Sequence, residues 1–194
     1  MFGGTFSADM AGRAPGSLGL VQDFVNTLEM EPRDADVEQL GTPAALTAWL
    51  TDRGLLAGSS AGDADLALAV DVREAIRRLL FANNGGPTHE ADLALLNRVA
   101  VETGLRPRFE AGGGVVLEPA AGGVPGALGR LVAAVSEAMN AGTWRRLKAC
   151  GDQGCRWAFY DGSKNRSGHW CSMESCGNRA KAQQFRQRHR AAAP

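Results

Sequence analysis

Apolar residues recur at helical spacing in five separate segments, with polar residues between them. Each stripe falls on one face when it is wound at 3.6 residues per turn, so each segment is expected to form an amphipathic helix. The pattern therefore predicts a mainly helical domain. The stripes are Leu20–Leu28, Leu46–Leu50, Leu68–Leu79, Leu93–Ala100 and Leu128–Met139.

Several helix ends carry their own signals. Thr42 followed by Pro43 is typical of an N-cap and a first helical residue. Thr88 is placed to cap the helix that contains Leu93. Between the fourth and fifth helices, two short strand-like runs flank a glycine-rich turn, which predicts a β-hairpin. Those runs are Arg106–Phe109 and Val115–Leu117.

The first sixteen residues show no periodicity and are rich in glycine and small side chains. We expect residues 1–16 to be disordered. They lack the apolar core of a signal peptide, and no other stretch approaches a membrane span. A cytoplasmic protein that does not contact membranes is the expectation.

All four cysteines of the chain lie near its C-terminus. They form two pairs, each with four residues between, and fifteen residues separate the pairs. Two close thiolate pairs across a short loop suit a tetrahedral Zn²⁺ site. The predicted ligands of this single zinc ion are Cys150, Cys155, Cys171 and Cys176.

Two alternatives to zinc are two disulfides and four unrelated free thiols. The lack of a secretory signal argues against disulfides, and the confinement of all four cysteines to 27 residues argues against unrelated thiols. Four cysteine ligands leave no open position on the metal, so the predicted zinc is structural. His169 lies between the pairs as an alternative ligand, but four cysteines already complete the site.

The segment around the cysteines predicts a small zinc finger of treble-clef-like order. A hairpin is expected between the pairs, from the apolar run Trp157–Tyr160 through a turn at Asp161, and a helix after Cys176. The predicted fold class is therefore mainly α, of the α+β type. The expected domains are a disordered 1–16, a helical 17–143 with its small β-hairpin, and a finger at 144–194. Loss of zinc should unfold the finger and leave the helical domain folded.

These residues resemble a known family. The run Cys176-Gly177-Asn178-Arg179, with Phe159-x-Asp161-x-Ser163 and Trp170–Met173, is similar to the CGNR zinc finger. That finger lies at the C-terminus of bacterial proteins described as stress-induced transcription regulators. The helical N-terminal region of those proteins is called the ABATE domain. The opening segment Leu20–Leu28 resembles the start of that domain. The resemblance implies a regulator, but it supplies no biochemical activity.

Charge is divided unevenly between the two parts of the chain. The whole chain is neutral, but residues 144–194 carry eleven Lys or Arg against three Asp or Glu. The finger therefore has a net charge of +8 and the rest of the chain −8. A basic finger indicates an anionic partner. A solvated charged surface without a partner, or attraction between the two halves, would also explain the pattern.

The last helix supplies side chains that grip phosphates and read base edges. We expect its apolar face, Ala182, Phe185 and His189, to pack on the hairpin around Trp157 and Phe159. DNA is the predicted partner, and RNA remains open. The predicted contact residues are Arg179, Lys181, Gln183, Arg186, Arg188 and Arg190.

The helical domain is predicted to sense a small molecule. Asn26 lies within an apolar stretch and Arg73 lies beside an apolar stripe, so both are candidate ligand contacts in a pocket between helices. The alternatives are local capping or a satisfied core hydrogen bond for Asn26, a surface position for Arg73, and a domain that only forms a homodimer or binds a partner protein.

No catalytic constellation is evident in the sequence. The chain has no phosphate loop, no zinc-protease histidine pattern and no nucleophile elbow. The sequence therefore favours a DNA-binding transcription regulator over an enzyme. A zinc-stapled protein-interaction module, or an enzyme with its pocket among the helices, is the alternative.

Overall fold

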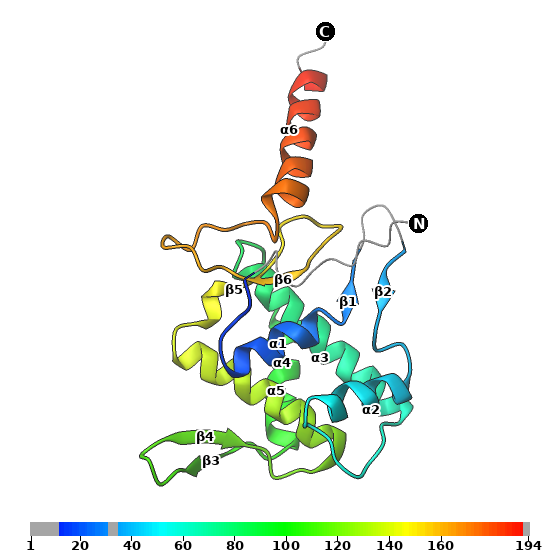
Figure 1. Cartoon of the computed structure of the whole chain (residues 1–194), viewed down its shortest axis with the longest axis vertical. Helices are drawn as coiled ribbons and strands as arrows, with labels where there is room; N and C mark the ends of the chain where they lie inside the picture. The colour runs from blue at the N-terminus through cyan, green and yellow to red at the C-terminus, as the bar shows by residue number, and fades with distance from the viewer. Residues whose placement is uncertain (1–11, 31–34, 192–194) are drawn as a thin grey trace.

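The computed structural model describes residues 12–30 and 35–191, with side chains up to His189. Its helices form a layered bundle, from which the last helix projects (Figure 1). The helices are α1 (Ser17–Val25), α2 (Pro43–Asp52), α3 (Asp63–Ala82), α4 (Glu90–Glu102), α5 (Gly123–Asn140) and α6 (Asn178–Ala191).

The strands form three separate antiparallel pairs, so the predicted mainly helical α+β class is confirmed. The pairs are β1 (Leu28–Glu29) with β2 (Val37–Glu38), β3 (Arg106–Phe109) with β4 (Val115–Glu118), and β5 (Leu147–Ala149) with β6 (Ala158–Tyr160). A 3₁₀ turn, η1 (Trp144–Arg146), precedes β5, and a π turn, η2 (Met173–Gly177), precedes α6.

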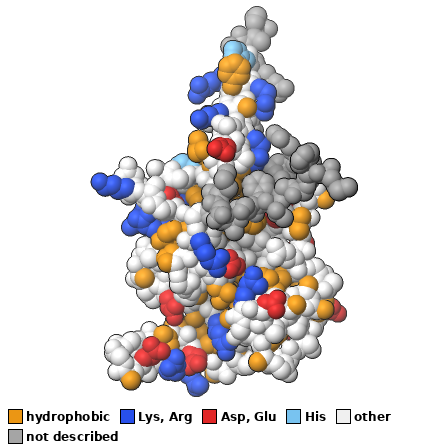
Figure 2. All heavy atoms as spheres, viewed as in Figure 1, with side chains coloured by type: hydrophobic (Ala, Val, Ile, Leu, Met, Phe, Trp, Pro, Cys, Tyr) orange, Lys and Arg blue, Asp and Glu red, His pale blue; other side chains and the backbone are white. Residues whose placement is uncertain are grey.

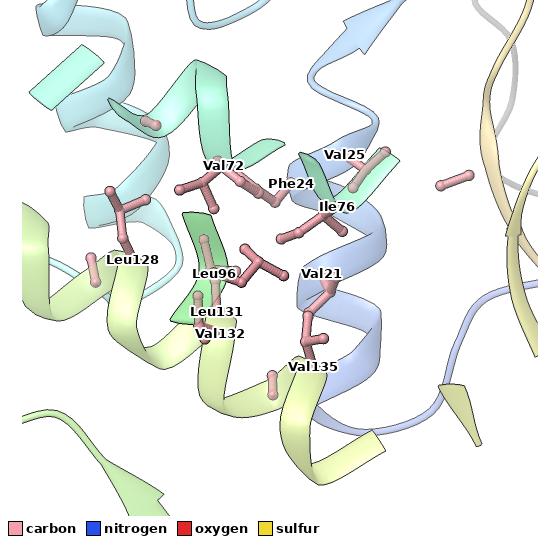
Figure 3. Close-up of a cluster of buried hydrophobic side chains, with 14 of the residues drawn as sticks. Val21, Phe24, Val25, Val72, Ile76, Leu96, Leu128, Leu131, Val132 and Val135 are labelled. Atoms are coloured by element: carbon pink, nitrogen blue, oxygen red, sulfur yellow. The ribbon is translucent and has the colours of Figure 1, made fainter. Parts of the chain in front are cut away.

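The long helix α3 packs against α1, α2, α4 and α5. Figure 3 shows the apolar side chains of α1, α3, α4 and α5 meeting between the helices, among them Phe24, Ile76 and Leu131. Those three side chains are completely buried. The apolar stripes are therefore the buried faces of amphipathic helices, as their periodicity predicts, because each stripe packs against another and is removed from water.

The core continues into the predicted finger. Leu147, Ala149 and Ala158 are fully buried in the same apolar cluster as the helices, and β5 packs against α3. The domain ranges stay a prediction. The shared core nevertheless means that the strands of the finger and the helical bundle stabilise each other.

The hairpin of the finger is placed differently from the sequence prediction. Its strands β5 and β6 flank the first cysteine pair, with Ala149 opposite Ala158, whereas the prediction put both strands after Cys155. Leu147 and Ala149 supply the buried apolar positions that a strand needs. The chain after Tyr160 is polar and carries no strand before Cys171.

The apolar face predicted for α6 does not pack on this hairpin. The helix projects away from the bundle (Figure 1), and Phe185 is 64% exposed with its ring against His189. That expectation was wrong because α6 begins at the metal site and leaves it in the outward direction.

Of the N-terminal stretch predicted to be disordered, residues 1–11 lie outside the described residues. Residues 12–16 lie against the bundle: Ala14 is buried, and the Gly12 carbonyl accepts a hydrogen bond from the Tyr160 amide at 3.0 Å.

Candidate metal centre and nucleic-acid interface

The four predicted ligands converge. Their sulfur atoms all lie within 4.8 Å of one another, and all four cysteines are buried and free of disulfides. Cys171 Sγ lies 3.7 Å from Cys155 Sγ and 3.6 Å from Cys176 Sγ. A tetrahedral Zn²⁺ with bonds of about 2.3 Å separates its sulfur ligands by about 3.8 Å. The donor set and its spacing therefore fit one zinc ion.

Two local turns present the sulfurs. Cys150 follows β5, and its amide donates to the Trp157 carbonyl at 2.9 Å, which closes the first pair into a knuckle between β5 and β6. Cys171 and Cys176 lie around the η2 turn, where the Ser172 hydroxyl accepts from the Ser175 amide. These hydrogen bonds hold the two cysteine pairs in turns that face each other at the metal site.

The thiols cannot all lose their protons unaided. Hydrogen bonds, first from Cys155 and then from Cys171 and Cys176, hold the pKa of Cys150 far below its ordinary value. The pKa of the Cys171 thiol is raised, first by its hydrogen bond with Cys150. A divalent cation removes this conflict, because it stabilises all four thiolates at once.

Arg179 joins α6 to the metal site. Its Nε donates to Asp152 Oδ2 at 2.8 Å, and its Nη2 donates to Cys176 Sγ at 2.9 Å. Burial would lower the pKa of Arg179, but the bond to Asp152 and the Cys176 charge outweigh it. The guanidinium therefore orients one ligand and anchors the knuckle to the first turn of α6.

A buried ion pair fixes the loop between the cysteine pairs. Lys148 Nζ lies 2.8 Å from Asp161 Oδ2 and also donates to the carbonyls of Arg166 and Gly168. Burial would raise the pKa of Asp161, but hydrogen bonds from Lys148, Ser163 and Gly168 keep it well below its ordinary value. Each charge is fully paired, as a buried ion pair requires.

Two family models match the chain in the order in which these elements occur. Residues 18–153 match the ABATE model, described as "Putative stress-induced transcription regulator". The chain belongs to the ABATE family. Residues 146–189 match the CGNR zinc finger, so the four-cysteine centre is the zinc site of that finger.

A comparison with curated proteins found no match. The family description indicates a regulator, and it adds no residue-level assignment. The overlap of the two matches at residues 146–153 coincides with β5 and the first knuckle, where the bundle and the CGNR finger share a core.

Asn26 joins the ABATE helices to the CGNR finger. Its Nδ2 donates to the Ala158 carbonyl at 3.0 Å, and its Oδ1 accepts from the Ala158 amide at 2.8 Å. Both polar atoms of this 8% exposed side chain are thus satisfied by β6. The ligand contact stays a prediction, and in this structure Asn26 acts as a pairing partner for the strand edge.

Other side chains bind the finger's backbone in the same manner, and the sequence prediction missed them. Asn83 Nδ2 donates to the Trp144 and Leu147 carbonyls, both at 2.9 Å. Asn84 Nδ2 donates to the backbone carbonyls of Ala149 and His169, and Arg77 Nη1 donates to the backbone carbonyl of Arg156. The pair Asn83-Asn84 reads in the sequence as a helix breaker, and only the fold brings β5 to it.

Arg73 is 1% exposed and lies among carboxylates of the ABATE domain. Its guanidinium donates two bonds of 2.7 Å to Glu38 and one of 2.8 Å to Glu74, and Nη1 also donates to the Thr27 hydroxyl. A ligand at Arg73 would have to displace these partners. That assignment, too, stays a prediction.

The predicted nucleic-acid residues divide into two groups. Arg179 is committed to the metal site, whereas Lys181, Gln183, Arg186 and Arg188 are exposed on α6. The Arg190 side chain lies outside the described residues. A hollow of about 520 Å³ lies between the first knuckle and α6, and its lining on the helix side includes Arg179, Gln183 and Arg186.

Within the described residues, no helix has the length and apolar character needed to cross a membrane.

Proposed function

We propose that this ABATE protein is a transcription regulator whose CGNR finger binds duplex DNA, with α6 entering the major groove. The supporting observation is the exposure of α6 together with its charge. Every described side chain from 181 to 189 is exposed, and the helix contains no acidic residue. Figure 2 shows Lys and Arg side chains along the projecting helix.

The dimensions of α6 suit a groove. Its fourteen residues span about 21 Å at the usual rise, and the major groove accepts an α-helix. Gln183 and Arg186 lie on one side of the helix, facing the hollow beside the knuckle, and are the candidates for base contacts. Lys181 and Arg188 lie on another side, where phosphates would flank a groove-bound helix.

The basic side chains are available for a partner. Within the described part of the chain, Lys181, Arg186 and Arg188 form no ion pair, whereas Arg179 pairs with Asp152. Three unpaired cations along two helical turns attract a polyanion. The acidic bundle lies on the other side of the metal site, so repulsion between it and DNA helps to orient the complex.

Fluorescence anisotropy with a labelled random duplex tests the proposal on the zinc-loaded full chain. Lys181, Arg186 and Arg188 are changed together to Gln, and Arg98→Gln on α4 is the matched control. At any one salt concentration between about 50 and 200 mM, we expect the triple variant to bind at least about tenfold more weakly than the unmodified chain. The control is expected to bind as the unmodified chain does.

The salt dependence separates the possible partners. If α6 contacts phosphates, the slope of log K against log salt is negative, and its magnitude decreases by about 0.9 for each contact removed. Absence of binding at low salt, or equal affinities for the triple variant and the control, would overturn the proposal. Tighter binding to single-stranded RNA than to the duplex would identify RNA as the partner. Binding to polyglutamate but to neither nucleic acid would identify an acidic protein as the partner.

A further inference from the structure

A second hollow, of about 310 Å³, lies in the ABATE domain between α4, α5 and β4. Its wall is apolar and includes Leu96, Ala100, Leu117, Val132 and Val135. It shares no residue with the predicted contacts Asn26 and Arg73. We propose that this hollow binds a small, neutral, largely apolar molecule that carries one hydrogen-bonding group.

The polar atoms of the hollow define the chemistry of its occupant. Only Asn97 and Ser136 are polar among the described residues that line it, and neither side chain makes a hydrogen bond within the described part of the chain. Asn97 is exposed and Ser136 is half-buried, so a hydroxyl, carbonyl or amide on the ligand would pair with either side chain in place of solvent. Since no charged side chain appears in this described lining, an ionised ligand would be desolvated without a counter-charge.

The size of the hollow favours a small molecule over a protein segment. Its volume lies at the lower end of the range found for ligand pockets. Leu93 and Met139 stand in its lining and remain 40% and 42% exposed. Both are long, flexible side chains, and methionine adapts readily to different shapes. A bound ligand would cover both side chains, and burial of their exposed apolar surface would favour binding.

The position of the hollow connects it to the finger. Val132, Val135, Ser136 and Met139 all lie on the last turns of α5. Immediately beyond them, the Thr143 amide donates to the Ala138 carbonyl at 3.0 Å, and the chain then enters η1 and β5. A ligand that shifts the end of α5 therefore acts at the base of the zinc knuckle. This regulatory consequence rests on the proposed function, but the pocket itself does not.

Binding is tested on the zinc-loaded full chain with N-phenyl-1-naphthylamine, a neutral probe that fluoresces in apolar surroundings. We expect a saturable rise in fluorescence. Ala100→Phe fills the hollow and should weaken probe binding at least about tenfold. Ala91→Phe adds the same ring to the exposed far side of α4 and is the matched control, expected to bind the probe normally.

A second measurement does not require the larger side chain to be tolerated. Competition should show 2-naphthol displacing the probe several-fold better than naphthalene, because only 2-naphthol offers a hydroxyl. Changing Asn97 and Ser136 together to Ala should remove that preference. No saturable signal, or equal loss in Ala100→Phe and Ala91→Phe, would overturn the assignment, as would a preference that survives in the double variant.

Oligomeric state distinguishes the remaining occupant. If a second copy of the chain covers the hollow, sedimentation would show a dimer that Ala100→Phe dissociates, and the probe would not bind. That result would overturn the ligand assignment. Because none of these measurements involves DNA, failure of the pocket and failure of the proposed DNA binding can be told apart.

Discussion

Asn26 and Ala158 are 132 residues apart in the chain and exchange two hydrogen bonds, of 3.0 and 2.8 Å. The side-chain amide of Asn26, the C-cap residue of α1, thereby takes the place of a neighbouring strand along β6. Through this pair the helical bundle fixes the hairpin that carries the first half of the zinc site.

Changing Asn26 to Asp keeps the shape of the side chain but replaces its N–H donor. The new oxygen would face the Ala158 carbonyl, so we expect the free energy of unfolding to fall by about 1–3 kcal/mol. Asn140→Asp, at the exposed end of α5, is the control. Equal urea midpoints for both variants would show that the pairing carries no stability.

Zinc removal should destabilise the whole described chain and not the finger alone. Leu147, Ala149 and Ala158 belong to the core of the bundle. Cys171→Ser is therefore expected to lower the free energy of unfolding of the bundle by at least about 3 kcal/mol. Far-ultraviolet circular dichroism during urea unfolding measures this, with Ser167→Ala as a control that keeps its metal. An unchanged helical transition in Cys171→Ser would support the independent domains predicted from sequence.

Arg179 is predicted to hold the metal centre. Arg179→Lys loses the fork that joins Asp152 to Cys176, so zinc affinity should fall about 10- to 100-fold. Arg186→Lys, on the same side of α6 but away from the sulfurs, is the control. Competition for zinc with a chromophoric chelator gives both affinities. If the two variants retain zinc equally, the contact to Cys176 has no role in binding.

The ion pair between Glu38 and Arg73 should make stability depend on acid pH. Burial would raise the pKa of Glu38, but hydrogen bonds from Arg73 and Leu40 bring it below its ordinary value of 4.5. A carboxyl group with a lowered folded pKa stabilises the protein above its unfolded pKa, and that contribution disappears as the pH falls through the folded value.

Glu38→Gln should therefore be less stable than the unmodified chain at about pH 7, and the difference should shrink below about pH 4. Glu102→Gln, whose partner Arg98 is 4.0 Å away on an exposed face, serves as the control and should show little difference at either pH. Urea unfolding at several pH values provides the comparison. A difference for Glu38→Gln that stays constant into acid would contradict this account.

Local signals in the sequence were sufficient for much of the fold. Thr42 caps α2 by accepting from the Ala45 amide, as its position before Pro43 predicts. The glycine-rich turn at 111–114 does join two paired strands. The cysteine spacing identified the metal site, because ligand pairs in tight turns are local features. One boundary differed slightly: His89, and not Thr88, is the N-cap of α4.

Long-range pairings were not accessible from the pattern. Nothing near Leu147 indicates that it pairs with Tyr160 across the first knuckle. Asn26 and Asn83 carry no local mark that their amides bind strands more than fifty residues away. The outward direction of α6 depends on the geometry of η2 at the metal site, so the exposure of Phe185 could not be read from a helical wheel.

The most direct test of DNA binding by α6 is a chemical-shift map. Amide ¹⁵N–¹H spectra of the zinc-loaded full chain are recorded with and without a short duplex. We predict that the largest shifts fall on α6, from Lys181 to Arg188, and on the knuckle residue Gln153, while α4 around Arg98 is unchanged. Shifts confined to the helical bundle, or none at all at low salt, would contradict it.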